Sequence, residues 1–131
     1  MSGILFISLE REVEGLVDDL GGKAWARSFD ELDELAKQLG HRPLNDFISA
    51  TPEQMAERIE SGNLLPDQIV PEAWYPAEDG LRTIRGLLGH LRHAPQSPHR
   101  AQPVIPDLES AERILLTACQ RGVHFHLTFA V

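Results

Sequence analysis

The last nine residues of the chain alternate between apolar and polar side chains, and this pattern restricts the fold more than any other feature. The two sets are Val123, Phe125, Leu127, Phe129 and Val131 on one side, and His124, His126, Thr128 and Ala130 on the other. Because successive side chains of a strand point to opposite faces, residues 123–131 are predicted to form a strand with one packed face and one solvated, polar face. A lone strand leaves its main-chain groups unpaired, so a partner strand is required.

The beginning of the chain supplies that partner. Residues 3–9, Gly-Ile-Leu-Phe-Ile-Ser-Leu, are apolar on both alternating faces, which is typical of a buried strand. Most of the intervening chain has helical spacing, and 131 residues fall within the size of one domain. We therefore expect an α+β fold, a single helix-rich domain over residues 1–131 whose small β-sheet includes the N- and C-terminal strands.

Apolar residues at helical spacing predict helices in five places. The ranges are 10–20, 28–40, 51–62, 76–91 and 107–122. Two of them begin with the spacing of a capping box, Ser28 with Glu31 and Thr51 with Gln54. Glycine follows the first range and closes the second, the third and the fifth, in keeping with its frequent place at helix C-termini.

Two proline-containing stretches separate the later helices. Residues 63–76 are expected to form a structured loop with a short strand at 68–70, and to bring Trp74 to the core. Residues 95–106 hold four of the nine prolines, which predicts an irregular or mobile loop.

Acidic residues outnumber basic ones, and the excess lies in the first half of the chain. The net charge is −8, and residues 1–60 hold thirteen Asp and Glu against six Lys and Arg, whereas residues 61–131 hold seven against six. This balance opposes nonspecific attraction to nucleic acid or to an anionic membrane, so neither is expected as a partner. A single cysteine, no signal-peptide pattern and apolar runs far shorter than about 20 residues predict a soluble, cytoplasmic protein.

His124 and His126 stand two residues apart on the polar face of the last predicted strand. Their rings project to the same side, which is the placement that two ligands of one metal ion require. No neighbouring Cys or carboxylate completes a zinc motif, and His90 and His93 near a helix end are the candidates for further ligands. One hypothesis is therefore a metal-binding protein or metal-dependent enzyme with zinc or another divalent metal. The competing interpretation is that both are ordinary polar side chains on a solvated face.

The leading hypothesis is a non-enzymatic protein-interaction module that binds a basic partner, as an immunity or inhibitor protein does. No complete catalytic constellation is visible, and Cys119 has the position of a small buried hydrophobe. A negative surface steers a basic partner and raises the association rate. The residues expected to contribute are Glu10, Glu14, Asp18, Asp19, Asp30, Glu34 and Tyr75. A homo-dimer, through the locally basic residues 80–100 or an exposed strand edge, is compatible with both hypotheses.

Overall fold

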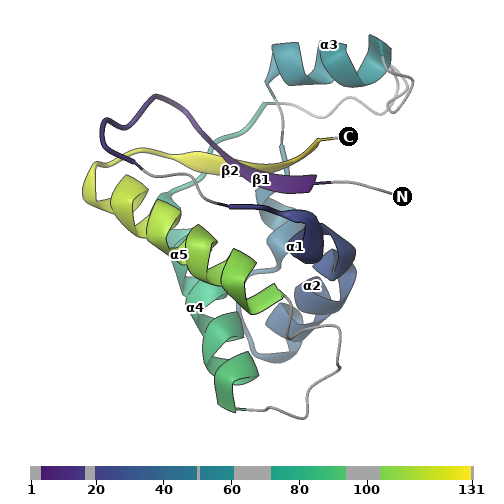
Figure 1. Cartoon of the computed structure of the whole chain (residues 1–131), viewed down its shortest axis with the longest axis vertical. Coiled ribbons are helices and arrows are strands. Elements are labelled where there is room, and N and C mark those ends of the chain that lie inside the picture. Colours follow the sequence, from purple (N-terminus) through teal and green to yellow (C-terminus); the bar gives the residue numbers. More distant parts are fainter. Residues whose placement is uncertain (1–3, 17–19, 50, 61–71, 94–103, 131) are drawn as a thin grey trace.

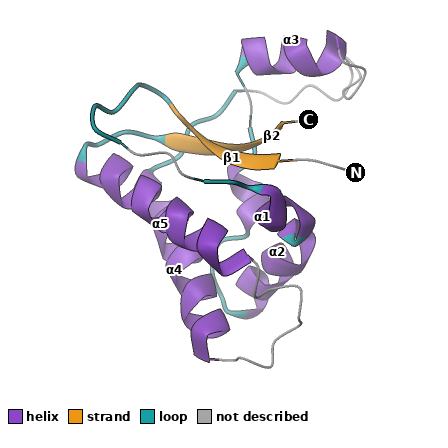
Figure 2. Cartoon of the chain, viewed as in Figure 1, coloured by secondary structure: helices purple, strands orange, loops and turns teal. Residues whose placement is uncertain are grey.

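The computed structural model describes residues 4–16, 20–49, 51–60, 72–93 and 104–130 (Figure 1). Two strands from opposite ends of the chain, β1 (Ile4–Leu9) and β2 (Phe125–Ala130), form an antiparallel sheet. Between them the described residues form five α-helices and one 3-10 helix, namely α1 (Lys23–Arg27), α2 (Phe29–Gln38), η1 (Leu44–Phe47), α3 (Pro52–Glu60), α4 (Ala77–His93) and α5 (Ile105–Gln120). The predicted α+β class is confirmed, including the sheet built from the two ends of the chain (Figure 2).

The helices lie on both sides of the sheet (Figure 1). On one side α1, α2, α4 and α5 gather under β1 and β2, and on the other side stands α3. The core forms between the sheet and the larger group of helices. Its fully buried side chains include the following: Leu5, Trp25, Phe47, Leu87, Leu108, Leu115 and Phe125. The apolar stripes predicted for α4 and α5 supply most of the helical part, because both helices bury one face against the other and against the sheet.

Strand β2 makes main-chain hydrogen bonds along both of its edges. Beside β1, the N–H of Glu10 donates to the His124 carbonyl at 3.1 Å. Along the other edge, Tyr75 and Phe125 exchange two hydrogen bonds of 2.8 and 2.9 Å, and the Ser49 N–H donates to the strand at 3.0 Å. Strand β1 is therefore an edge strand, and β2 is the central one.

The predicted helix over residues 10–20 is wrong for the part of it that the structure describes. Residues 10–16 form a bend and a turn, in which Gly15 has a positive φ of 80° and Leu16 N–H donates to the Val13 carbonyl at 3.2 Å. The main chain of Glu10 is already paired with β2, so it is not free to start a helix. Val13, Leu16 and Leu20, which are apolar residues of the predicted helix, are half-buried against the core. The helix forms instead after Gly22, as the short α1.

Of the two predicted capping boxes, one is formed and the other is not. At α3 the capping box is confirmed, since the Gln54 N–H donates to Thr51 Oγ1 at 3.2 Å and the Thr51 N–H donates to Gln54 Oε1 at 2.8 Å. At α2 the expected capping box is not formed, because Ser28 makes no side-chain capping bond. Ser28 is also the C-terminal cap of α1. Its N–H donates to the Ala24 carbonyl, and its backbone has a φ of −100° and a ψ of 9°.

Helix α5 begins at Ile105, two residues before the predicted start. Pro106 falls in its first turn, where its missing N–H costs nothing, so the end of the proline-rich stretch is helical rather than irregular. The expectation that Cys119 is buried is also wrong, because its side chain is exposed next to the buried Ala118. The predicted strand at 68–70 and residues 95–103 of the proline-rich stretch lie outside the described residues.

The polar face of the last predicted strand is solvated at His124, as predicted, but it is buried at His126 and Thr128, which corrects the prediction for these two residues. His126 and Thr128 are both 0% exposed. The Trp74 ring stacks on the His126 ring, with 4.1 Å between the ring centroids, and α3 lies on the same side of the sheet. Trp74 is itself half-buried, so it covers an edge of the molecule instead of filling the core as predicted.

Candidate functional site

A groove of about 860 Å³ runs along the outer edge of β1. Its walls are β1 itself, the loop of residues 11–16 and the side chain of Ile114 from α5. Residues 11–16 form a bend and a turn where a helix was predicted, and the groove lies between these residues and the strand.

Two anchors fix where the loop begins. The Glu10 carboxylate accepts the His124 N–H at 3.0 Å, and its Oε1 lies 3.8 Å from Nδ1 of the same histidine. The guanidinium of the next residue, Arg11, donates to the Arg121 carbonyl at 2.9 Å, which satisfies an acceptor just past the end of α5. Both side chains are thus used to attach the loop to the molecule, and their charges are partly satisfied there.

The far end of the β1 edge is closed by Gly22. The Leu5 N–H donates to the Gly22 carbonyl at 3.1 Å. The two backbones approach so closely that a Cβ at Gly22 would lie 2.0 Å from the Leu5 carbonyl oxygen, and Gly22 has a φ of 80°. Glycine is therefore needed here, both for its conformation and for its lack of a side chain.

Beyond Leu5 the outer edge of β1 has no hydrogen-bonding partner among the described residues. In an antiparallel pair the residues alternate between those that bond to the partner strand and those that face away from it. Glu10 bonds to β2 and Leu5 bonds outward to Gly22, so Ile7 and Leu9 also direct their N–H and C=O groups outward. No hydrogen bond joins these outward groups to any residue that the structure describes. They face the groove, which both residues line.

Glu12 and Glu14 give the groove its charge. Both side chains line it and are exposed. Neither carboxylate has an ion-pair partner in the described parts of the chain, which distinguishes them from the anchored Glu10. Because the neighbouring Arg11 is bound at the end of α5, its guanidinium does not pair with either of the two carboxylates.

The other predicted interaction residues do not join this groove. Asp30 and Glu34 lie on α2, which Figure 1 places at the opposite end of the sheet from the loop after β1. Glu34 pairs with Lys37 at 3.2 Å. Tyr75 is half-buried and packs edge-to-face on Phe47, with 5.6 Å between the ring centroids. Asp18 and Asp19 lie outside the described residues. The structure thus brings Glu10 and Glu14 together on one loop and separates them from the α2 pair.

The two histidines proposed as metal ligands have separate surroundings. His124 is exposed beside Glu10. His126 is fully buried, with Nδ1 3.0 Å from the Ala73 carbonyl oxygen and Nε2 3.4 Å from Gln54 Oε1. His90 and His93 stand near the end of α4, at the opposite end of the molecule from β2 (Figure 1). Among the residues described here, no group of three or more His, Cys, Asp or Glu side chains has a placement that would hold a metal ion.

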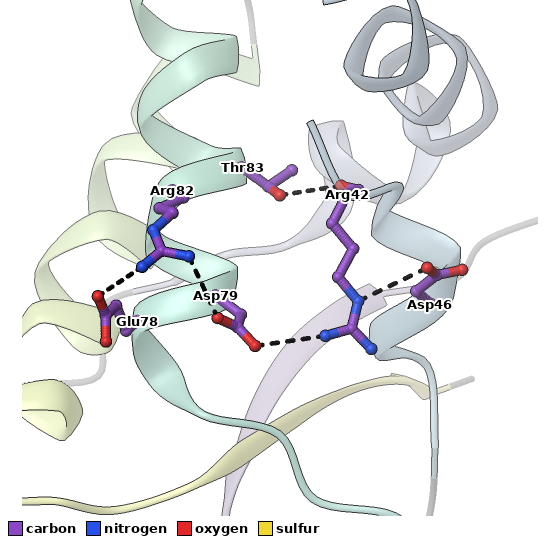
Figure 3. Close-up of polar contacts among 6 residues, drawn as sticks. All are labelled: Arg42, Asp46, Glu78, Asp79, Arg82 and Thr83. Atoms are coloured by element: carbon purple, nitrogen blue, oxygen red, sulfur yellow. Dashed lines mark hydrogen bonds and ion pairs between the residues drawn. The ribbon is translucent and has the colours of Figure 1, made fainter. Parts of the chain in front are cut away.

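The arginines of the locally basic α4 form ion pairs with glutamates of the same molecule. Arg85 pairs with Glu112 at 3.2 Å and Arg92 pairs with Glu109 at 3.0 Å, so both reach across to α5. Arg82 pairs with Glu78 at 2.7 Å on its own helix (Figure 3). These contacts leave little free positive charge on the described part of residues 80–100.

Arg42 forms a polar cluster that the sequence pattern did not reveal (Figure 3). Its guanidinium lies 3.6 Å from Asp46 and 3.4 Å from Asp79, and its carbonyl accepts the Thr83 hydroxyl at 2.9 Å. The same guanidinium lies over the Phe47 ring, 4.8 Å from its centroid. The cluster ties η1 to the start of α4, and its carboxylates are occupied, so we assign it to the support of the fold. The spacing of Arg42 and Asp46 was the one available signal.

Comparisons with protein-family models, with curated proteins and with solved structures found no match to this chain. Within the described residues, no helix combines the length and the apolar content that crossing a membrane requires.

Proposed function

We propose that this chain is a non-enzymatic protein-interaction module that binds a basic segment of a partner protein, as immunity and inhibitor proteins do. The observation that carries the proposal is the groove beside β1, where the carboxylates of Glu12 and Glu14 are exposed and have no cationic partner among the described residues. The proposal places this binding in the cytoplasm, where the exposed thiol of Cys119 stays reduced.

The use of carboxylates elsewhere in the molecule supports this choice of site. Asp33 accepts the Asn45 N–H at 2.8 Å, and Asp107 accepts the Trp25 N–H at 3.1 Å. These groups stabilise the fold. Exposed carboxylates without such partners add nothing comparable, whereas they attract a cation that approaches the groove. Their attraction is long-ranged and screened by salt, so it raises the rate of association most at low ionic strength.

The test is a comparison of two charge-reversal variants in affinity capture from cell lysate. One carries Glu12→Lys and Glu14→Lys at the groove, and the matched control carries Asp30→Lys and Glu60→Lys on exposed positions of α2 and α3. Both change the net charge equally. We expect the wild-type chain and the control to retain the same basic protein at 50 mM salt, and the groove variant to lose it.

The salt dependence provides the second readout. Raising the salt concentration from 50 to 500 mM shortens the range of the electrostatic attraction several-fold and is expected to weaken capture by the wild-type chain. Retention of one partner by all three proteins at both salt concentrations would remove the electrostatic basis of the proposal. Failure of the wild-type chain to retain any basic protein would do the same.

A further inference from the structure

We infer that the partner segment binds in the groove as an extended strand that adds to the outer edge of β1. This inference rests on the proposed function, because it specifies how the basic segment is held. Its basis is the main chain of β1, because the N–H and C=O groups of Ile7 and Leu9 face the groove. A strand added in this way would turn the present two-stranded pairing of β1 and β2 into a sheet with β1 inside it.

Ile7 is only 7% exposed and its side chain belongs to the core, whereas its N–H and C=O face the groove. An edge strand whose main-chain groups have no partner is a ready template for another strand. The closure at Leu5 by Gly22 marks where such a strand would have to stop, so the free stretch is short and defined at one end.

The groove also indicates the side chains that the added strand would carry. Its lining combines the apolar residues Val13, Leu16 and Ile114 with the acidic residues Glu12 and Glu14. A strand sends alternate side chains to opposite faces. The segment that fits both parts of the groove therefore alternates apolar residues with Lys or Arg.

A second copy of this chain is a poorer occupant than a basic segment. Pairing of two β1 edges would bring the Glu12 and Glu14 carboxylates of one copy toward those of the other, and like charges at such an interface are repelled. Charge complementarity thus favours a segment of the opposite sign over self-association.

The experiment uses a fluorescein-labelled peptide of six residues that alternates lysine and valine, with binding to the full chain followed by fluorescence anisotropy at 50 mM salt. Two further peptides carry N-methyl groups, one on all lysine amides and one on all valine amides. In an extended strand, the lysine N–H groups face one edge and the valine N–H groups face the other. Methylation on the edge that faces β1 is expected to weaken binding at least about tenfold, because it removes hydrogen bonds to β1, whereas methylation on the other edge leaves it unchanged.

The outcomes separate this inference from the proposed function. Equal binding of both methylated peptides would overturn strand addition while leaving a salt-dependent basic site in place. Equal binding of the unmethylated peptide to the wild-type chain and to the Glu12→Lys, Glu14→Lys variant would overturn the groove as its location. If the chain alone forms a dimer that the peptide dissociates, a second copy already occupies the edge, and the inference fails in favour of homo-dimerisation. The proposed function itself is tested by the capture experiment with whole proteins, and only that experiment overturns it.

Discussion

Asp33 and Asp107 show how single carboxylates of this chain stabilise helix ends from a distance. Each accepts a main-chain N–H near the start of another element, Asn45 in η1 and Trp25 in α1, where the first turn has no internal acceptor. Asp33 is 9% exposed, and the N–H that donates to it lies twelve residues further along the chain, so no local spacing in the sequence predicts this contact.

Replacement of Asp33 by Ala is expected to lower the free energy of unfolding by about 1 to 3 kcal/mol, because it leaves the Asn45 N–H without its charged acceptor. Asp30→Ala, on the exposed face of the same helix, is the control and should cost no more than about 1 kcal/mol through the helix dipole. Urea denaturation of both variants measures the difference. Equal costs would mean that the Asp33 contact adds nothing to stability.

The pKa of Lys37 is raised, first by its hydrogen bond to Glu34 and then by Asp33. Because the folded-state pKa lies above the unfolded value, the contacts stabilise the fold while pH is below about 10.4, and this stabilisation is lost as pH rises through the folded pKa. Titration of the Lys37 side chain by NMR should show the raised pKa, and Glu34→Gln should bring it back toward its usual value. An unchanged Lys37 pKa in that variant would contradict the assignment.

At the scale of elements, the sequence patterns predicted several features that depend on contacts between residues close together in the chain. The stripes of α4 and α5 and the capping box of Thr51 and Gln54 depend on residues within one or two turns, and the structure has them. Two of the failed predictions depend on distant partners, whereas the capping box of Ser28 and Glu31 is local and fails where Ser28 also ends α1. Residues 10–16 are held by β2 and by the end of α5, and the face of β2 with His126 is covered by residues 73–74 and Gln54. No periodicity within a segment carries that information.

Helix α4 contains a matched pair of glycines that tests its packing on the sheet. A Cβ on Gly80 would lie 2.3 Å from Cζ of Phe125, whereas a Cβ on Gly89 meets nothing within 4 Å. Gly89→Ala should therefore stabilise the protein by about 0.5 to 1 kcal/mol, as in an ordinary helix interior. Gly80→Ala should destabilise it by about 1 to 3 kcal/mol through overpacking against the buried ring. Thermal unfolding of both variants gives the two signs, and equal signs would show that α4 and β2 are not packed this closely.

At the scale of the whole molecule, the candidate site arises from the order of its strands. Since β2 takes the central position, β1 is left with an outer edge, and the loop that follows β1 opens a groove along that edge. The sequence predicted acidic residues here, among them Glu10 and Glu14, and allowed for an exposed strand edge. It did not predict the groove or the part played by Glu12, because both depend on which edge of β1 faces β2.

The salt dependence of binding tests whether the acidic groove beside β1 attracts a basic segment electrostatically. If the groove attracts a basic segment through Glu12 and Glu14, the affinity for the alternating lysine and valine peptide should fall steadily as salt rises from 50 to 500 mM, and the Asp30→Lys, Glu60→Lys control should follow the same curve. Anisotropy titrations at several salt concentrations measure it. An affinity that stays constant across this range would assign the binding to apolar contacts alone.

Amide hydrogen exchange along β1 tests the open edge most directly. The account predicts an alternation in the free protein, with slow exchange at Phe6 and Ser8, whose amides face β2, and faster exchange at Ile7 and Leu9, whose amides face the groove. Addition of the basic peptide should slow exchange at Ile7 and Leu9 and leave Phe6 and Ser8 unchanged. Equal protection of all four amides in the free protein, or no gain at Ile7 and Leu9 in the complex, would contradict a free edge that binds a strand.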